Sequence, residues 1–449
     1  MVMDMTTGSP IRRIMRFFIP VLLGNLLQQF YSMADSAIVS RTLGISAFAG
    51  VTATGALNFL ILGCALGICS GFSIPISQEF GAGRYSAMRK YFANSLYVAG
   101  LIAVAMGLAT ALLSPTILRL VGTPEDIFSY SLAYIRIIFA GIPATVLYNL
   151  LSGVMRAVGD GRTPLLMLLC STLLNIALDL LFIVVFHMGI AGAAFATILS
   201  QLVSGLLCAL VIRRRFDLLQ IRGDEWRNDF HAWRYLLAIG LPMGLQFSIT
   251  AIGSTIIQSA VNSLGSQAVA AIGTGVRVQF VFTTPLEAVG VTMATYSGQN
   301  LGARRIDRVR AGIHQTTVIM TLYSFAAFAL QLLVGRTIAM LFVEPEETLI
   351  LDRAVQYLGI VTGTSCLLAY VLIFRNAIQG LGYSRVAMIA GLMELIGRAF
   401  VAFVLVRLYG FTGACLANPA AWLCADVFLI PAYCIIVRRL AVKYPVVPV

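Results

Sequence analysis

Long runs of apolar residues recur along the whole chain, and they constrain its fold more than any other feature of the sequence. Breaks at glycine, proline and charged clusters separate twelve such runs. A helix needs about 20 apolar residues to cross a hydrocarbon core of about 30 Å, and each run reaches that length. Only 11% of the 449 residues are charged and 59% are hydrophobic, whereas soluble domains carry about 25% charged residues. We therefore expect an all-α polytopic membrane protein.

The breaks define the expected transmembrane spans, whose boundaries carry the usual errors of a few residues. They are 16–38, 51–78, 90–113, 127–151, 163–187, 190–212, 233–259, 271–298, 314–342, 350–375, 385–408 and 411–437.

The basic residues predict the orientation of these spans. If the N-terminus is cytoplasmic, most of the 31 Lys and Arg residues fall in cytoplasmic segments. The outer segments hold only Arg41, Arg119, Arg336, Arg353 and Arg407. Cytoplasmic loops of membrane proteins are enriched in Lys and Arg, so we expect a multi-pass protein of the plasma (inner) membrane with both termini cytoplasmic. The net charge of +12 then faces acidic lipid headgroups, and no nucleic-acid partner is expected.

The chain is predicted to be an internal duplication. "SQEFGAGRYSAMRK" at Ser77 resembles "GQNLGARRIDRVR" at Gly298, "RTLGISAFAG" at Arg41 resembles "NSLGSQAVAA" at Asn262, and "MGIAGAAFAT" at Met188 resembles "YGFTGACLAN" at Tyr409. All three matches share an offset of 221 residues. Six spans per copy is an even number, so both copies enter the membrane in the same direction and form two six-helix parallel repeats. We expect an N-terminal lobe at 1–212, a cytoplasmic linker at 213–234 and a C-terminal lobe at 235–449.

Polar residues inside the spans point to a functional site, because a charge at the bilayer centre costs at least about 2.5–3.5 kcal/mol. Asp179 lies near the middle of the fifth span, with Asn175 one helical turn earlier on the same face. Asp35 lies late in the first span among polar neighbours, and Thr197 in the sixth span supplies a further oxygen. Together these oxygens suit a bound cation or a shared proton. The alternative for Asp179 is a buried aspartate satisfied by Asn or Thr alone, and for Asp35 an aspartate that meets water at the outer end of its helix.

The acidic residues of the second half give weaker evidence for a functional site. Glu394 and Arg398 have the spacing of a structural ion pair on one helix. Glu287 and Asp426 have no obvious local partner, and the sequence leaves open whether any of these acids lines a cavity.

The number of spans, the duplication, "QEFGAGR" with its copy "QNLGARR", and "RAVGDGRTP" at Arg156 together resemble the multidrug and toxic compound extrusion (MATE) family over nearly the whole chain. The resemblance implies a MATE-like fold and export of organic, often cationic, compounds by alternating access, coupled to inward flow of H⁺ or Na⁺. It resembles the DinF-like branch, whose coupling site would here comprise Asp35, Asn175, Asp179 and Thr197, with Tyr134 and Asn149 as supporting residues. Another branch uses acids in the seventh and tenth helices, but here the tenth span carries Arg375 instead.

Several other functions are less consistent with the sequence. There is no Gly-x-x-x-x-Gly-Lys-Ser/Thr loop for ATP, and neither a nucleophile–base set nor a metal-ligand motif at membrane depth, so we expect no enzyme, no cofactor and no metal beyond possible Na⁺ at the coupling residues. A lipid-linked precursor flippase of related architecture is the main alternative, and the acids of the first half favour cationic or neutral amphipathic substrates over its pyrophosphate. We expect a monomer whose partners are such small molecules and membrane lipids. The sequence leaves the choice of Na⁺ or H⁺ open.

Overall fold

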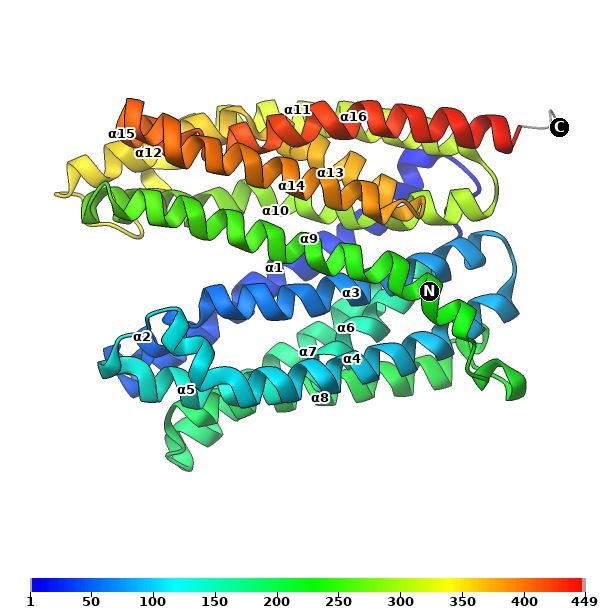
Figure 1. The fold of residues 1–449 in the computed structure, drawn as a ribbon, viewed down its shortest axis with the longest axis horizontal. Helices are drawn as coiled ribbons and strands as arrows, with labels where there is room; N and C mark the ends of the chain where they lie inside the picture. The colour runs from blue at the N-terminus through cyan, green and yellow to red at the C-terminus, as the bar shows by residue number, and fades with distance from the viewer. Residues whose placement is uncertain (1, 446–449) are drawn as a thin grey trace. The chain divides into compact units, whose positions relative to one another are not determined.

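The structure is a computed structural model that describes residues 2–445, and all regular secondary structure in that range is helical (Figure 1). The first half contains α1 (Pro10–Leu43), α2 (Ile45–Ala53), α3 (Gly55–Gly81), α4 (Tyr85–Leu120), α5 (Glu125–Ala140), α6 (Ile142–Ala157), α7 (Arg162–Asp179), the π-helix η1 (Leu180–Val185) and α8 (Gly189–Arg215). Two short 3₁₀ turns, η2 (Asp217–Leu219) and η3 (Gly223–Trp226), follow. The second half contains α9 (Phe230–Asn262), α10 (Ser266–Gly302), α11 (Ile306–Ala339), α12 (Thr348–Gly363), α13 (Ser365–Gly380), α14 (Ser384–Phe400), the π-helix η4 (Val401–Leu405), α15 (Val406–Cys415) and α16 (Ala417–Lys443).

The number of spans agrees with the sequence. Among the described residues, nine helices are long and apolar enough to cross a membrane, and eleven spans result if each of two bent pairs is one span. The bends are 48° where α5 meets α6 and 46° where α12 meets α13. α1 has 34 residues and is also long enough, but its polar residues, including Asp35, lower its hydropathy. With α1, the fold has the twelve transmembrane helices predicted from the sequence.

The duplication is visible in the backbone as well as in the sequence. Left-handed backbone positions of the first half recur 221 residues later, where the chain turns between helices and a positive φ is needed. The pairs are Gly44 (φ 83°) with Gly265 (φ 92°), Gly83 (φ 70°) with Arg304 (φ 58°), and Gly189 (φ 60°) with Gly410 (φ 55°). The π-helices η1 and η4 also begin 221 residues apart. The fold is therefore two six-helix parallel repeats.

The contacts between residues divide the helices into two compact units. The N-unit comprises Ile19–Gly244 together with residues up to Asp4, and the C-unit comprises Met5–Phe18 together with the chain from Leu245 onward. The first turns of α1 thus belong to the C-unit, and the first turns of α9 belong to the N-unit. Both helices contain an interior proline close to the point of division, Pro20 in α1 and Pro242 in α9. Proline removes one backbone hydrogen bond, so each helix has a natural bending point there.

Within the N-unit, α9 crosses α3 at a close glycine contact. A Cβ atom added to Gly71 would lie 2.5 Å from the Cα atom of Gly240, and one added to Gly244 would lie 2.8 Å from the carbonyl oxygen of Cys64. Small residues allow helices in a membrane to approach closely. The main hydrophobic core of this unit lies beside the contact and includes Phe72.

The predicted linker is folded against the start of α4. Nε and Nη2 of Arg89 donate to the two carboxylate oxygens of Glu225, each at 2.7 Å. The Arg89 guanidinium lowers the pKa of Glu225 to about 2. Lys90 pairs with Asp229 at 2.8 Å, and that ion pair likewise lowers the pKa of Asp229.

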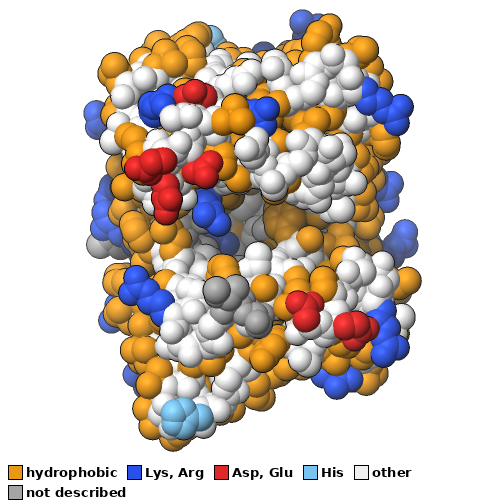
Figure 2. Space-filling view, turned by 90° about the vertical axis from the view of Figure 1, so that its left-hand side faces the viewer, with side chains coloured by type: hydrophobic (Ala, Val, Ile, Leu, Met, Phe, Trp, Pro, Cys, Tyr) orange, Lys and Arg blue, Asp and Glu red, His pale blue; other side chains and the backbone are white. Residues whose placement is uncertain are grey.

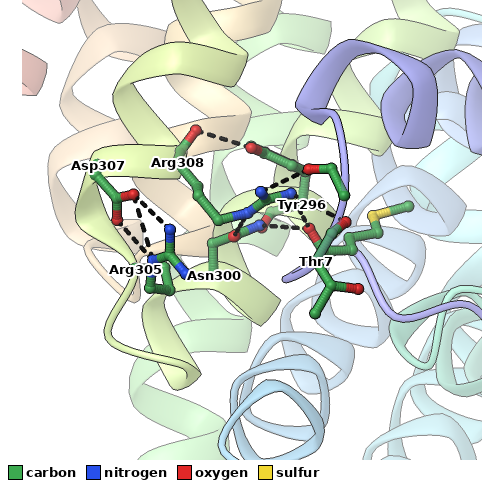
Figure 3. Close-up of polar contacts among 8 residues, drawn as sticks. Thr7, Tyr296, Asn300, Arg305, Asp307 and Arg308 are labelled. Atoms are coloured by element: carbon green, nitrogen blue, oxygen red, sulfur yellow. Dashed lines mark hydrogen bonds and ion pairs between the residues drawn. The ribbon is translucent and has the colours of Figure 1, made fainter. Parts of the chain in front are cut away.

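The segment that precedes α1 is anchored on the C-unit by Arg308 (Figure 3). The guanidinium of Arg308 donates to the carbonyl oxygens of Gly8 (2.7 Å), Met5 (3.1 Å) and Thr7 (3.2 Å) and to Oδ1 of Asn300 (3.1 Å). The amide N–H of Met5 donates to Oε1 of Gln299 at 2.9 Å, and the Met5 side chain is fully buried. The repeated motif of the second half, Gly298 to Arg310, thus binds the N-terminal segment.

The outward sides of the helices carry large apolar side chains, for example Leu101, Leu112 and Leu333. Figure 2 shows hydrophobic side chains over much of one face, with the charged side chains in small groups. Extensive exposed apolar surface of this kind marks contact with lipid.

Candidate functional site

α7 places Asn175 and Asp179 one turn apart on its buried face, and both residues are 0% exposed. α7 packs along α8, which covers this face. Asp179 is the last residue of α7, and the π-helix η1 begins at the next residue. In η1 the hydrogen bonds span five residues, as from the Phe186 N–H to the Leu181 carbonyl (2.9 Å). Such π-turns are frequent at functional sites.

α1 brings a second carboxyl group to Asp179. Asp35 is half-buried, and its carboxyl group lies within hydrogen-bonding range of that of Asp179, although 144 positions separate the two residues in the sequence. Tyr31 lies one turn before Asp35 on the same helix, and its hydroxyl group lies next to the side chains of Thr197 and Ser200 on α8.

Helices α8 and α5 supply the remaining residues around the carboxyl groups of Asp35 and Asp179. Thr197 is half-buried, and its carbonyl oxygen accepts a hydrogen bond from Oγ of Ser200 at 2.8 Å. Ser171 Oγ on α7 donates to the carbonyl oxygen of Ser200 at 3.3 Å, which ties α7 to α8. The hydroxyl group of Tyr134 on α5 is buried and close enough to Asp35 and Asp179 to interact electrostatically with both. The structure therefore gathers Asp35, Asp179, Thr197 and Tyr134 in one place, with Asn175 one turn from Asp179.

Asn149 has a different environment. Its amide group donates to the carbonyl oxygen of Thr145 at 2.8 Å, within its own helix α6. Thus its side chain is engaged by the local backbone, and its supporting role stays a prediction.

Two adjacent carboxyl groups in a low-dielectric site repel each other strongly when both are ionised. A shared proton or a bound cation removes this repulsion, and such a pair titrates as one unit. The hydroxyl groups of Tyr31, Thr197 and Tyr134 offer further oxygens. Chemically, the cluster is suited to take up and release a small cation.

The family model described as MatE matches the chain twice, over residues 20–181 and 242–404. The chain belongs to the MATE family. The two matches start at the same point of each six-helix repeat.

Relatives of the chain include multidrug resistance proteins. The probable multidrug resistance protein YpnP of Bacillus subtilis is 33% identical over 308 residues, which cover 68% of each chain. The probable multidrug resistance protein NorM of Thermotoga maritima is 24% identical over 90% of this chain and 88% of NorM. A solved structure of the outward-facing conformation of a multidrug resistance MATE family transporter has a TM-score of 0.90 at 22% identity, over 96% of this chain and 97% of that chain, which shows the shared fold. The protein is thus a MATE family efflux transporter.

In this MATE chain the acids of the C-unit are arranged differently from Asp35 and Asp179. The predicted contact of Glu394 with Arg398 is confirmed at 3.4 Å, and Arg375 of α13 forms a shorter ion pair with Glu394 at 2.9 Å. Asp426 is buried on α16, where Arg375 and Glu394 are its charged neighbours. Glu287 lines a cavity within the C-unit. Two arginines therefore pair with Glu394 in this unit.

Sequence reasoning missed two contributors to the site in the N-unit. Tyr31 stands one turn before Asp35, a spacing that puts both on one helix face, and that signal was available. Ser200 stands three residues after Thr197 on α8. A serine there is unremarkable in sequence, so only the packing of α1 on α8 reveals it.

Proposed function

We propose that this transporter is a cation-coupled antiporter, which exports organic compounds in exchange for H⁺ or Na⁺ bound at Asp35, Asn175, Asp179 and Thr197. The observation that carries the proposal is the approach of the Asp35 and Asp179 carboxyl groups inside the N-unit, where Asp179 is fully buried. Ionisable residues inside a membrane protein are costly and are usually functional.

Binding of the cation changes the forces within the site. Without it, the two carboxylates repel each other and favour an arrangement that separates them or admits water. With it, α1 and α7 are held together through Asp35 and Asp179. Because α1 contains Pro20, it bends there at low cost, and occupancy of the site alters the shape of the N-unit. This supplies the two states that alternating access requires.

The available energy is sufficient for export. One charge that moves through about 100 mV releases about 2.3 kcal/mol. Since about 1.4 kcal/mol corresponds to a tenfold concentration ratio, a fully coupled exchange of one cation for one neutral substrate molecule sustains a substrate gradient of about fiftyfold. Cationic or neutral amphipathic compounds suit a carrier whose N-unit site is acidic. The distribution of Lys and Arg supports a plasma-membrane location with both termini cytoplasmic.

Everted membrane vesicles expose the cytoplasmic face of the transporter, so uptake of a fluorescent cationic dye added outside them tests the proposal. Asp179→Asn is expected to abolish dye transport while the protein reaches the membrane in normal amount. Asp126→Asn is the matched control, because Asp126 is an exposed aspartate in the first turn of α5, away from the cluster. Wild-type transport by Asp179→Asn would refute the coupling role.

Proteoliposomes distinguish the ions. Dye transport is measured under a pH gradient alone and under a Na⁺ gradient alone, with Asp35→Asn alongside the wild type. The ion whose gradient drives transport is the coupling ion. Transport by Asp35→Asn that responds to the gradient as in the wild type would remove Asp35 from the site.

A further inference from the structure

The C-unit contains a cavity that the proposed coupling site does not use. Its volume is about 420 Å³, within the range of about 300–1,000 Å³ typical of small-molecule sites. Residues of α9, α10, α12, α13, α14, α15 and α16 line it, including Gln279, Tyr357, Arg398, Asn418 and Trp422.

Arg398 is the residue that gives the cavity its chemistry. It is 7% exposed and lines the cavity. Its Nη2 atom lies 3.4 Å from Glu394, whereas its buried Nη1 atom has no hydrogen-bond partner within residues 2–445. Arginine stays charged in proteins, so a buried guanidinium N–H without an acceptor is costly. Such a group is poised to bind an acceptor that enters from outside the chain.

The surrounding residues hold this arrangement in place. Tyr357 donates its hydroxyl hydrogen to Oε1 of Gln279 at 2.8 Å, and Asn418 donates to the Tyr357 oxygen at 3.3 Å. These polar groups therefore satisfy one another and form a fixed wall. On the side of α9, a Cβ atom at Gly253 would lie 3.2 Å from Nη1, so the absence of a side chain there leaves room for the guanidinium.

We propose that this cavity is a second ligand site, which binds amphipathic compounds carrying one carboxylate group. The carboxylate accepts from the Nη1 N–H of Arg398, and Trp422 with its apolar neighbours contacts the hydrophobic part. Charge-assisted hydrogen bonds of arginine with carboxylate are strong and directional. Glu287 lines the same cavity and Glu394 lies against Arg398, and their negative charges repel a pyrophosphate more strongly than a ligand with a single negative charge. The site lies in the C-unit, whereas the proposed coupling residues Asp35 and Asp179 lie in the N-unit.

Trp422 provides a reporter inside the cavity. The chain has three tryptophans, and the other two, Trp226 and Trp233, lie in the N-unit. In a W226F/W233F background, purified full-length protein is titrated with 4-nitrobenzoate, a quencher of tryptophan fluorescence, and with its neutral isostere 4-nitrobenzamide. We expect the carboxylate to bind at least about tenfold more tightly than the amide, as a charge-assisted hydrogen bond predicts. Equal affinity for the two probes would overturn the proposal.

Variants locate the effect. Arg398→Gln is expected to weaken the binding of 4-nitrobenzoate about tenfold or more. It should weaken the binding of 4-nitrobenzamide less than about threefold. Arg375→Gln is the matched control, because Arg375 pairs with the same Glu394 but does not line the cavity, and it should weaken carboxylate binding much less than Arg398→Gln. Asp126→Asn, an exposed position in the N-unit, should leave both affinities unchanged.

Two further results would decide against the site. If Arg375→Gln weakens the binding of 4-nitrobenzoate as much as Arg398→Gln does, the loss of any nearby positive charge explains the result. The assignment of the site to Arg398 is then wrong. If thermal melting shows that Arg398→Gln does not fold, Arg398→Lys carries the test. Lysine keeps the positive charge but lacks the planar guanidinium group with its parallel N–H donors. We therefore expect the preference for carboxylate over amide to fall about threefold or more. An unchanged preference in Arg398→Lys overturns the proposal.

Discussion

Replacing Arg308 with alanine should release the N-terminal segment from the C-unit. Arg308 is 8% exposed, and three of its hydrogen bonds go to backbone carbonyls of Met5, Thr7 and Gly8. The Met5 carbonyl also accepts from Nδ2 of Asn300 at 3.3 Å, and the Thr7 carbonyl from Nε of Arg13 at 3.3 Å. The side chain therefore holds three carbonyl groups of a segment that has no regular structure of its own.

The size of the effect follows from these contacts. Hydrogen bonds to a charged group contribute about 1.5–3 kcal/mol each, and such contributions are not additive. In the variant, the carbonyl groups form hydrogen bonds with water when the segment undocks. The loss of docking free energy is therefore smaller than the sum of the individual hydrogen bonds. Burial of the Met5 side chain, worth about 1.5–3 kcal/mol, still favours docking. We expect docking to weaken by about 3 kcal/mol, which is an increase of about a hundredfold in the undocked population.

Amide hydrogen exchange measures this directly. The Met5 N–H donates to Gln299 at 2.9 Å only while the segment is docked, so its exchange should accelerate about a hundredfold in Arg308→Ala. Arg305→Ala is the matched control, because Arg305 pairs with Asp307 at 2.8 Å on the surface, where both side chains are well exposed. Surface ion pairs contribute about 0–1 kcal/mol, and the control should change exchange less than about fivefold. Equal exchange in the two variants, or no change in Arg308→Ala, would refute the anchoring role.

Two further predictions concern the N-unit. The ion pair of Arg89 with Glu225 lowers the pKa of Glu225 from its ordinary value of 4.5 to about 2, so its contribution to linker docking is complete above pH 4.5 and is lost as the pH falls toward 2. Trp226 fluorescence in a W233F/W422F background should therefore change between pH 4.5 and 2 in the parent and not in Glu225→Gln; the same transition in both would contradict this. Gly71→Ala should lower the thermal stability of the purified protein by about 2 kcal/mol or more, because its Cβ atom would lie 2.5 Å from the backbone of Gly240. Gly100→Ala, whose Cβ atom meets nothing within 4 Å, should cost less than about 1 kcal/mol, and similar melting of the two variants would show that the close contact is unimportant.

The candidate site shows how far sequence reasoning reaches. Asp179 and Asn175 were found because a carboxylate and an amide at helical spacing are conspicuous in an apolar run. Their burial, and the short distance between Asp179 and Asp35, became visible only in the structure, where α1 packs against α7 and α8. The π-helix that begins after Asp179 has no sequence signal, because Leu180–Val185 reads as ordinary lipid-facing helix. In the C-unit, the local pair of Glu394 with Arg398 was predicted from its spacing, whereas the contact of Arg375 with Glu394, from another helix, was not.

The sequence by itself determined the helical class, the spans and the duplication. In a bilayer every backbone N–H and C=O must be satisfied within the helix, so long apolar runs predict which segments cross, and a copied segment repeats its turns at the matching positions. Only the tertiary structure decided which side chains meet. Arg308 reads in sequence as one of many cytoplasmic charges, yet it holds Met5, and the unpaired Nη1 of Arg398 becomes visible only when its cavity is formed. These contacts join residues far apart in the chain, and their energy depends on burial and geometry that no local pattern encodes.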